Sequence, residues 1–242
     1  MIKDICAKAK EASRILAQLS TEEKNKILSR LIDSLNKNKE LIYNENQKDI
    51  DKAKEKGLNE AIIQRLKIDD KVFDEMIGGI KTIISLDDPI GEVIEERKII
   101  QDMILRKVRV PLGVVLIIYE SRPNVTINVS AICIKSGNAV ILKGGSDALN
   151  SNKALFNCVK EALGNNGIIL IDQPGHEIVT ELLKMNEYID VAIPRGGKRL
   201  IQKVVENARM PVIKHFEGVC AVYVDRDADI DKAVKVTLNA KV

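Results

Sequence analysis

The chain has 242 residues, of which 45% are hydrophobic and 30% charged. This composition is typical of a folded protein and excludes disordered and fibrous classes. Aromatic residues make up only 3% and Trp is absent, so we do not expect a base-stacking surface for nucleic acid. The net charge of +3 has its excess after residue 100. That excess suits a phosphorylated small molecule better than a polyanion, although scattered surface lysines would give the same balance.

Localisation and metal binding are constrained by what the sequence lacks. No apolar run approaches the roughly 18 residues of a membrane span, and the first 20 residues have no signal-peptide block. We therefore expect a cytoplasmic protein with no membrane partner. The four cysteines, at positions 6, 133, 158 and 220, are far apart, and there are only two histidines. These spacings indicate neither a disulfide framework nor a metal site.

Residues 1–88 are predicted to be an N-terminal helical segment. Apolar residues recur every three or four positions from Ile5 to Leu19, and Ser20 to Glu23 fits a capping box that opens a second helix. Further helices are expected over residues 41–56, 61–66 and 72–84. We expect these helices to form an antiparallel layer.

From residue 89 to residue 242 the pattern predicts an α/β domain that binds a dinucleotide. A turn at residues 88–91 leads into short strands within 94–110. Continuous β-branched runs then predict strands at 114–119, 139–142, 168–171, 189–193, 212–214 and 221–224. Helical patterns separate the first five of these runs, and a last helical stripe covers residues 230–238. Such runs are typical of strands covered on both faces, so we predict a doubly wound, Rossmann-type parallel sheet.

The loop that follows residues 114–119 is the first candidate site. In it, Arg122 and Asn124 are able to donate hydrogen bonds to a phosphate or to a developing oxyanion. An equally good interpretation is that Pro123 occupies the first helical position and Asn124 only caps the helix.

Two glycine loops are candidates for a cofactor site. Lys143, Gly144 and Gly145 follow one strand, and the lysine is placed to contact a ribose or its 2′-phosphate. The loop Arg195-Gly196-Gly197 joins another strand to a helix and is the better pyrophosphate candidate. A tight connection explains the first loop at least as well, and neither loop matches a standard nucleotide-binding fingerprint.

A fourth loop contains His215, Glu217 and Cys220, which suggests a nucleophile. Cys220 precedes an apolar run, however, and is better interpreted as a packed residue at the start of a strand. Cys133 lies in a helical apolar stripe and is expected in the core. We therefore assign no nucleophile within these loops.

Four segments together resemble the gamma-glutamyl phosphate reductase family, a branch of the aldehyde dehydrogenase superfamily. They are residues 110–114 (VPLGV), 119–126 (YESRPNVT), 135–145 (KSGNAVILKGG) and 193–197 (IPRGG). The likeness runs from near Ala9 to Asn239-Ala240-Lys241, and these motifs in this order are specific to the family.

The resemblance implies NADPH-dependent reduction of L-glutamyl 5-phosphate to L-glutamate 5-semialdehyde, a step of proline biosynthesis. It implies that Asn124 holds the oxyanion, that Lys143, with Gly144 and Gly145, lies near the adenosine ribose, and that the loop from Arg195 to Gly197 lies at the cofactor phosphates. Arg122 as a contact for the substrate phosphate is our own hypothesis. The family also implies a homo-oligomer.

The family nucleophile follows the Asn-Ala-Lys segment, and this chain stops at Val242. We therefore expect a fragment that lacks the catalytic domain and does not turn over. One alternative is a module that binds NADPH without chemistry, and another is a superfamily member that reduces a coenzyme A thioester. A helical assembly domain built on residues 1–85 is the least favoured interpretation.

Overall fold

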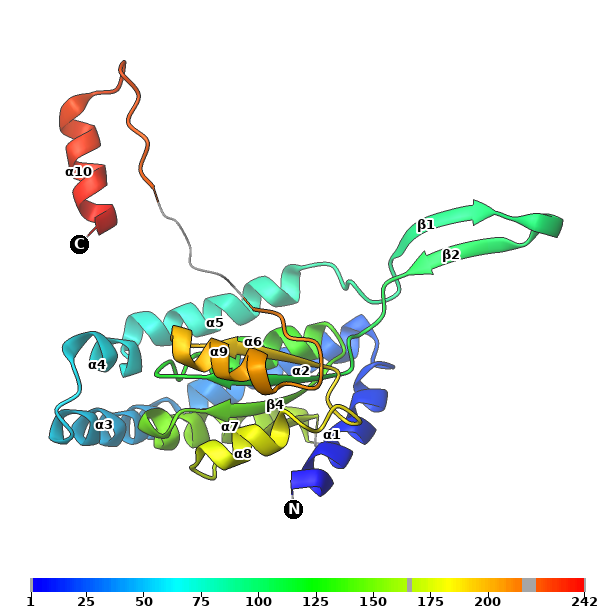
Figure 1. Ribbon diagram of the computed structural model, residues 1–242, viewed down its shortest axis with the longest axis horizontal. Helices are drawn as coiled ribbons and strands as arrows, with labels where there is room; N and C mark the ends of the chain where they lie inside the picture. Colours follow the sequence, from blue (N-terminus) through cyan, green and yellow to red (C-terminus); the bar gives the residue numbers. More distant parts are fainter. Residues whose placement is uncertain (1, 165–166, 215–220, 242) are drawn as a thin grey trace.

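The structure, a computed structural model, describes residues 2–164, 167–214 and 221–241 (Figure 1). It begins with five helices: α1 (Ile2–Leu16), α2 (Thr21–Lys37), α3 (Lys39–Glu55), α4 (Glu60–Leu66) and α5 (Asp70–Ser85). The predicted capping box is confirmed, because Glu23 N donates to Ser20 Oγ at 3.2 Å and Ser20 N donates to the Glu23 carboxylate at 2.8 Å. This reciprocal pair satisfies two of the amides that a helix start leaves without partners.

A four-stranded parallel sheet forms the centre of the fold. Its strands are β3 (Val114–Tyr119), β4 (Ala139–Gly144), β5 (Ile168–Leu170) and β6 (Val191–Arg195), in the order β5-β4-β3-β6. The chain first moves outward from β3 and then returns to add β6 on the other side of β3. The predicted α/β class with a doubly wound sheet is therefore confirmed, and its switch point lies between β3 and β6.

Helices cover the sheet on two faces. α6 (Val125–Lys135) and α7 (Leu149–Leu163) make the two outward crossovers, and α8 (His176–Leu182) makes the return crossover. Because parallel crossovers are right-handed, α8 lies on the face opposite to α6 and α7. The helices α2, α3 and α5 pack outside α6 and α7. α1 differs from the expected single layer, since it packs on the strands themselves and against α8.

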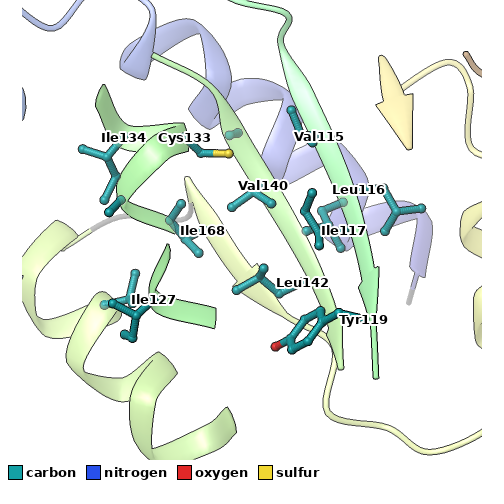
Figure 2. Close-up of a cluster of buried hydrophobic side chains, with 14 of the residues drawn as sticks. Val115, Leu116, Ile117, Tyr119, Ile127, Cys133, Ile134, Val140, Leu142 and Ile168 are labelled. Carbon is teal, nitrogen blue, oxygen red and sulfur yellow. The ribbon is translucent and has the colours of Figure 1, made fainter. Parts of the chain in front are cut away.

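The core explains why the central strands consist of unbroken apolar runs. All six residues of β3 and all six of β4 are buried. Figure 2 shows side chains from β3, β4, β5 and α6 meeting in this region, including Leu116, Leu142 and Ile134. One continuous cluster of buried residues extends from Ile2 in α1 through the sheet to Met210. The N-terminal helices and the sheet therefore share a core.

A hairpin projects from the body between α5 and β3 (Figure 1). It consists of β1 (Val93–Lys98), the short 3₁₀ helix η1 (Ile100–Asp102) and β2 (Ile104–Val108), so the strands predicted within residues 94–110 are confirmed. No residue of either strand is buried. Large apolar side chains, among them Ile100 at 80% exposure, stand in the open.

Two predicted strands near the C-terminus are wrong. Residues 212–214 contribute only a single bridge between Val212 and Ala192, after helix α9 (Lys198–Asn207). Residues 221–224 form no strand, and Tyr223 is 85% exposed. The β-branched run gives only a propensity, and a strand forms only where a neighbour takes its backbone hydrogen bonds. The last predicted helix is present as α10 (Ile230–Lys241), which stands apart from the sheet in Figure 1.

Candidate functional site

Three of the four candidate loops meet at the carboxyl edge of the sheet. In the register of the sheet, Tyr119 pairs with Gly144 of β4 on one side and with Arg195 of β6 on the other. The three strands therefore end at the same level, next to the switch point. A Cβ atom added at Gly145 would lie 3.7 Å from Glu120 Cα, which shows how closely two of the loops approach. The fourth loop, residues 215–220, lies outside the described residues.

The turn from β3 into α6 has a strained backbone and carries an asparagine side chain that has no hydrogen-bond partner among the described residues. Ser121 adopts φ +47°, a left-handed conformation that costs a non-glycine residue roughly 1–2 kcal/mol. Asn124, the residue directly before α6, has helical backbone angles, and its side chain makes no capping hydrogen bond. The capping interpretation of Asn124 is therefore wrong. In the part of the chain that the structure describes, its amide has no hydrogen-bond partner.

A buried polar network holds this turn in place. Thr126 Oγ1 donates to Asn152 Oδ1 at 3.1 Å, and it lies 2.7 Å from the Tyr119 hydroxyl, which therefore acts as the donor of that pair. Burial raises the pKa of Tyr119 to about 12, against a smaller opposing effect of the bond with Thr126. The phenol thus stays protonated. Thr126, two positions after Asn124, is therefore held both by Tyr119 of β3 and by Asn152 of α7.

In the turn from β6 into α9, the backbone binds the carboxylate of Glu120. The backbone amide of Gly197, the residue before the first of α9, donates to the Glu120 carboxylate at 2.9 Å. A Cβ atom at Gly196 would overlap that carboxylate, so only glycine allows this approach. Exposed amides at a helix N-terminus attract negative charge. The α9 N-terminus is therefore able to bind an anionic group, and Glu120 occupies the position.

Lys143 and Gly144 lie at the same edge but face inward. The Lys143 side chain is buried, and its Nζ donates to the carbonyl oxygen of Gly144 at 2.9 Å. Burial lowers the pKa of Lys143, and the Asp172 carboxylate partly opposes that shift. A Cβ atom at Gly144 would overlap the Asn152 amide, so the close packing requires glycine here. Lys143 must turn outward to contact any ligand.

Two neighbouring hollows open at this edge. One has a volume of about 540 Å³ and is lined by Ile62, Arg65, Glu120, Ser121, Arg122, Val125, Arg195, Gly196 and Gly197. The other has a volume of about 240 Å³ and is lined by Gln64, Arg65, Lys67, Ile68, Val72, Arg122, Pro123 and Asn124. Arg65 and Arg122 belong to both linings. The larger volume lies within the range of small-molecule sites.

Arg65 is the residue that sequence reasoning missed. It lies on α4, in a helix that the sequence did predict, but no local motif marks it as functional. Only the packing of α4 at the carboxyl edge brings it beside Arg122 and Arg195. Among the described residues, none of these three guanidinium groups forms an ion pair or a side-chain hydrogen bond.

The described cysteines are poor nucleophiles. Cys6, Cys133 and Cys158 are all buried and free, as predicted for Cys133. Burial, with a smaller effect of Glu181, raises the pKa of Cys6 to about 11, and burial raises the pKa of Cys133 to about 12 and also that of Cys158. The thiolate is the reactive form, so these thiols are inert near neutral pH.

The described residues contain neither a cluster of metal ligands nor a membrane-spanning helix. Within residues 2–164, 167–214 and 221–241, no three His, Cys, Asp or Glu residues are grouped so that they could hold a metal ion. Over the same residues, no helix combines the length and the apolar content needed to cross a membrane.

A doubly wound sheet with an anion-attracting edge at its switch point is the general plan of α/β proteins that bind dinucleotides. The aldehyde dehydrogenase family model matches residues 1–242, so the chain belongs to the aldehyde dehydrogenase family.

The comparisons with individual proteins agree with this assignment. Gamma-glutamyl phosphate reductase of Aquifex aeolicus is 48% identical over 246 residues, which cover 100% of this chain and 57% of the relative. The crystal structure of gamma-glutamyl phosphate reductase from Thermotoga maritima is 40% identical in sequence and has a TM-score of 0.91. The match covers 99% of this chain and 59% of the Thermotoga chain. The resemblance seen in the motifs is thus confirmed. The chain spans a little over half the length of these relatives.

A more distant structure shares only the fold. It is NADP-dependent glyceraldehyde-3-phosphate dehydrogenase from Bacillus halodurans, solved in complex with NADP, with 22% identity and a TM-score of 0.66. The match covers 90% of this chain and 44% of that one.

Proposed function

We propose that this chain provides the cofactor-binding part of a gamma-glutamyl phosphate reductase. The reaction is the NADPH-dependent reduction of L-glutamyl 5-phosphate to L-glutamate 5-semialdehyde with release of phosphate, a step towards proline. The observation that carries the proposal is the hollow at the switch point, where three arginines that have no ion pair among the described residues share the lining with the glycines before α9. The names of relatives at this level of identity support the substrate.

The residues at the larger hollow fit a dinucleotide. Gly196 and Gly197 expose backbone at a helix start, Arg195 adds positive charge, and the volume of about 540 Å³ accommodates part of such a ligand. When bound, the nicotinamide supplies the hydride. We propose that the pyrophosphate takes the position of the Glu120 carboxylate, and that Lys143 swings outward towards the ribose from the end of β4, with Gly144 and Gly145 as its neighbours.

The smaller hollow fits the acyl group. Asn124 lines it, and its amide has no hydrogen-bond partner among the described residues, so it is available to donate to a developing oxyanion. Arg122 lies on the same hollow and is suited to the phosphate of the substrate. We assign the nucleophile to none of Cys6, Cys133 and Cys158, whose thiols are buried and protonated.

A fluorescence titration with NADPH tests the cofactor site, and the absence of Trp leaves the signal clear. We expect saturable binding, and we expect Glu120→Gln to bind about two- to fivefold more tightly, since removal of a competing charge at a helix N-terminus gains roughly 0.3–1 kcal/mol. Glu11→Gln, an exposed position on α1, is the matched control. No saturable signal at millimolar NADPH would refute the proposal, and so would a Glu120→Gln affinity equal to that of the control.

A binding module without chemistry is the second candidate, and the inert state of the described thiols favours it. The assay is NADP-dependent and phosphate-dependent oxidation of glutamate semialdehyde by the 242-residue chain. We expect no turnover above a buffer control. A rate comparable with that of a full-length relative would show that the chain holds a working nucleophile. Replacement of phosphate by coenzyme A in the same assay tests the thioester alternative.

Domain organisation, assembly and location complete the proposal. We propose that residues 1–88 and 89–242 act together as one cofactor-binding domain, since one core cluster joins them and α4 lines the hollow. We also propose a homo-oligomer in the cytoplasm. The exposed apolar side chains of the hairpin support association, and analytical ultracentrifugation tests it.

A further inference from the structure

Arg65 is an exposed arginine that lines both hollows at the carboxyl edge of the sheet. Elsewhere on the surface, Arg106 pairs with Glu96 at 2.6 Å and Arg109 pairs with Glu92 at 2.6 Å. Lys67, two residues after Arg65, lies 3.5 Å from an Asp69 carboxylate oxygen. In the described part of the chain, Arg65 has no such partner, and neither has Arg122, which shares both hollows with it.

The backbone that carries Arg65 is fixed by buried hydrogen bonds. Asn46, which is 2% exposed, donates from Nδ2 to the carbonyl oxygen of Leu66 at 2.8 Å and accepts from the amide of Ile68 at 2.8 Å. It also donates to Ser151 Oγ of α7 at 3.0 Å. The residue next to Arg65 is therefore tied to the helix that follows β4, and the arginine extends from a rigid base.

Apolar packing holds α4 in the same place. Leu66 of α4 is fully buried against Ala53 of α3 and Ala148, which directly follows the loop at the end of β4. The helix therefore sits at the carboxyl edge of the sheet because of its own core contacts. Arg65 is exposed to solvent there, and its positive charge adds to the charges of Arg122 and Arg195 on the larger hollow, which favours an anionic ligand.

We propose that Arg65 and Arg122 form a two-arginine clamp that binds the phosphate group of the substrate. The proposal rests on the proposed function. The smaller hollow carries the clamp and Asn124, whereas Arg195 and the glycines of the α9 turn lie only on the larger one. Because Arg65 and Arg122 line both hollows, we assign the acyl phosphate to the side of the clamp that carries Asn124 and the dinucleotide to the side that carries Arg195. Guanidinium groups bind phosphate oxygens through paired, charge-assisted hydrogen bonds, which makes two of them a suitable receptor for a dianion.

The test measures binding of inorganic phosphate and of NADPH to the same 242-residue protein, by calorimetry for phosphate and by fluorescence for NADPH. The variants are Arg65→Gln, Arg65→Lys and Arg195→Gln, with Arg30→Gln on the exposed face of α2 as a charge-matched control. Far-ultraviolet circular dichroism and urea midpoints verify that each variant folds.

We expect Arg65→Gln to weaken phosphate binding at least tenfold, which corresponds to the roughly 1.5–3 kcal/mol of a hydrogen bond to a charged group. Arg65→Lys should recover part of the loss, because lysine keeps the charge but not the paired geometry. Arg195→Gln should show the opposite preference, with a larger loss for NADPH than for phosphate.

Three results would overturn the clamp. They are absence of phosphate binding to the parent protein, a phosphate affinity of Arg65→Gln equal to that of Arg30→Gln, and a loss confined to NADPH. The last result would assign Arg65 to the 2′-phosphate of the cofactor, and comparison of NADPH with NADH would identify it. If NADPH fails to bind but phosphate binding still depends on Arg65, the clamp stands and the cofactor proposal falls.

Discussion

Replacement of Asn46 by alanine should destabilise the protein strongly, because this one side chain satisfies two buried backbone groups. The carbonyl of Leu66 and the amide of Ile68 would both lose their partner. Each buried group without a partner costs about 1–3 kcal/mol, so we expect the free energy of unfolding to fall by about 3 kcal/mol. Ser151 loses little, since its hydroxyl still donates to Asp49 at 2.6 Å.

Urea unfolding, followed by circular dichroism, measures this effect. For a chain of this size the denaturant slope is about 3 kcal/mol per molar, so the midpoint should move down by about 1 M. Asn36→Ala, at an exposed position on the neighbouring helix α2, is the control and should change stability by less than about 0.5 kcal/mol. If Asn46→Ala matched that control, the buried hydrogen bonds would not be what holds α4 in place.

Substitutions at Gly144, Lys24 and Tyr119 test the packing and the ionisation of the core. Gly144→Ala should lower stability by about 1–3 kcal/mol through overpacking, whereas Gly78→Ala, in an open helical position, should raise it by about 0.5–1 kcal/mol; equal urea midpoints would contradict this. Lys24→Ala should lower the free energy of unfolding by about 3–5 kcal/mol, because Asp88 loses its buried ionic partner at 2.8 Å. Lys24→Met should lower it by less, and thermal unfolding of the two variants measures the difference. Tyr119 has a pKa raised from 10.0 to about 12, so the folded state retains a proton that the unfolded state releases. The free energy of unfolding should therefore fall as the pH rises from 10 to 12, and Tyr119→Phe should flatten that slope.

The sequence predicted the elements whose signals are local. The runs at residues 114–119 and 139–142 become β3 and β4 because their side chains are buried on both faces. Residues 221–224 show the limit of that reasoning. Their β-branched pattern is as good as that of β5, but no neighbouring strand pairs with them in the described structure, so their backbone stays in coil.

The candidate site was predictable only in part, for a related reason. The loops at Asn124, Gly144 and Arg195 follow strands of one parallel sheet, so topology alone brings them together. Arg65 comes from a helix far earlier in the chain. Its place depends on the burial of Leu66 against Ala148, a tertiary contact that no local spacing reveals. The inward direction of Lys143 depends on side-chain packing in the same way.

The buried network beneath the edge joins the stability of the fold to the geometry of the site. Thr126 is bound to Tyr119 of β3 and to Asn152 of α7, and it lies half a helical turn after Asn124. Because side chains in buried networks have little freedom, the start of α6 is held at a fixed height above the sheet. The backbone that carries the Asn124 amide is therefore positioned by buried groups of β3 and α7. Loss of a hydroxyl in this network should consequently disturb the hollow as well as the core.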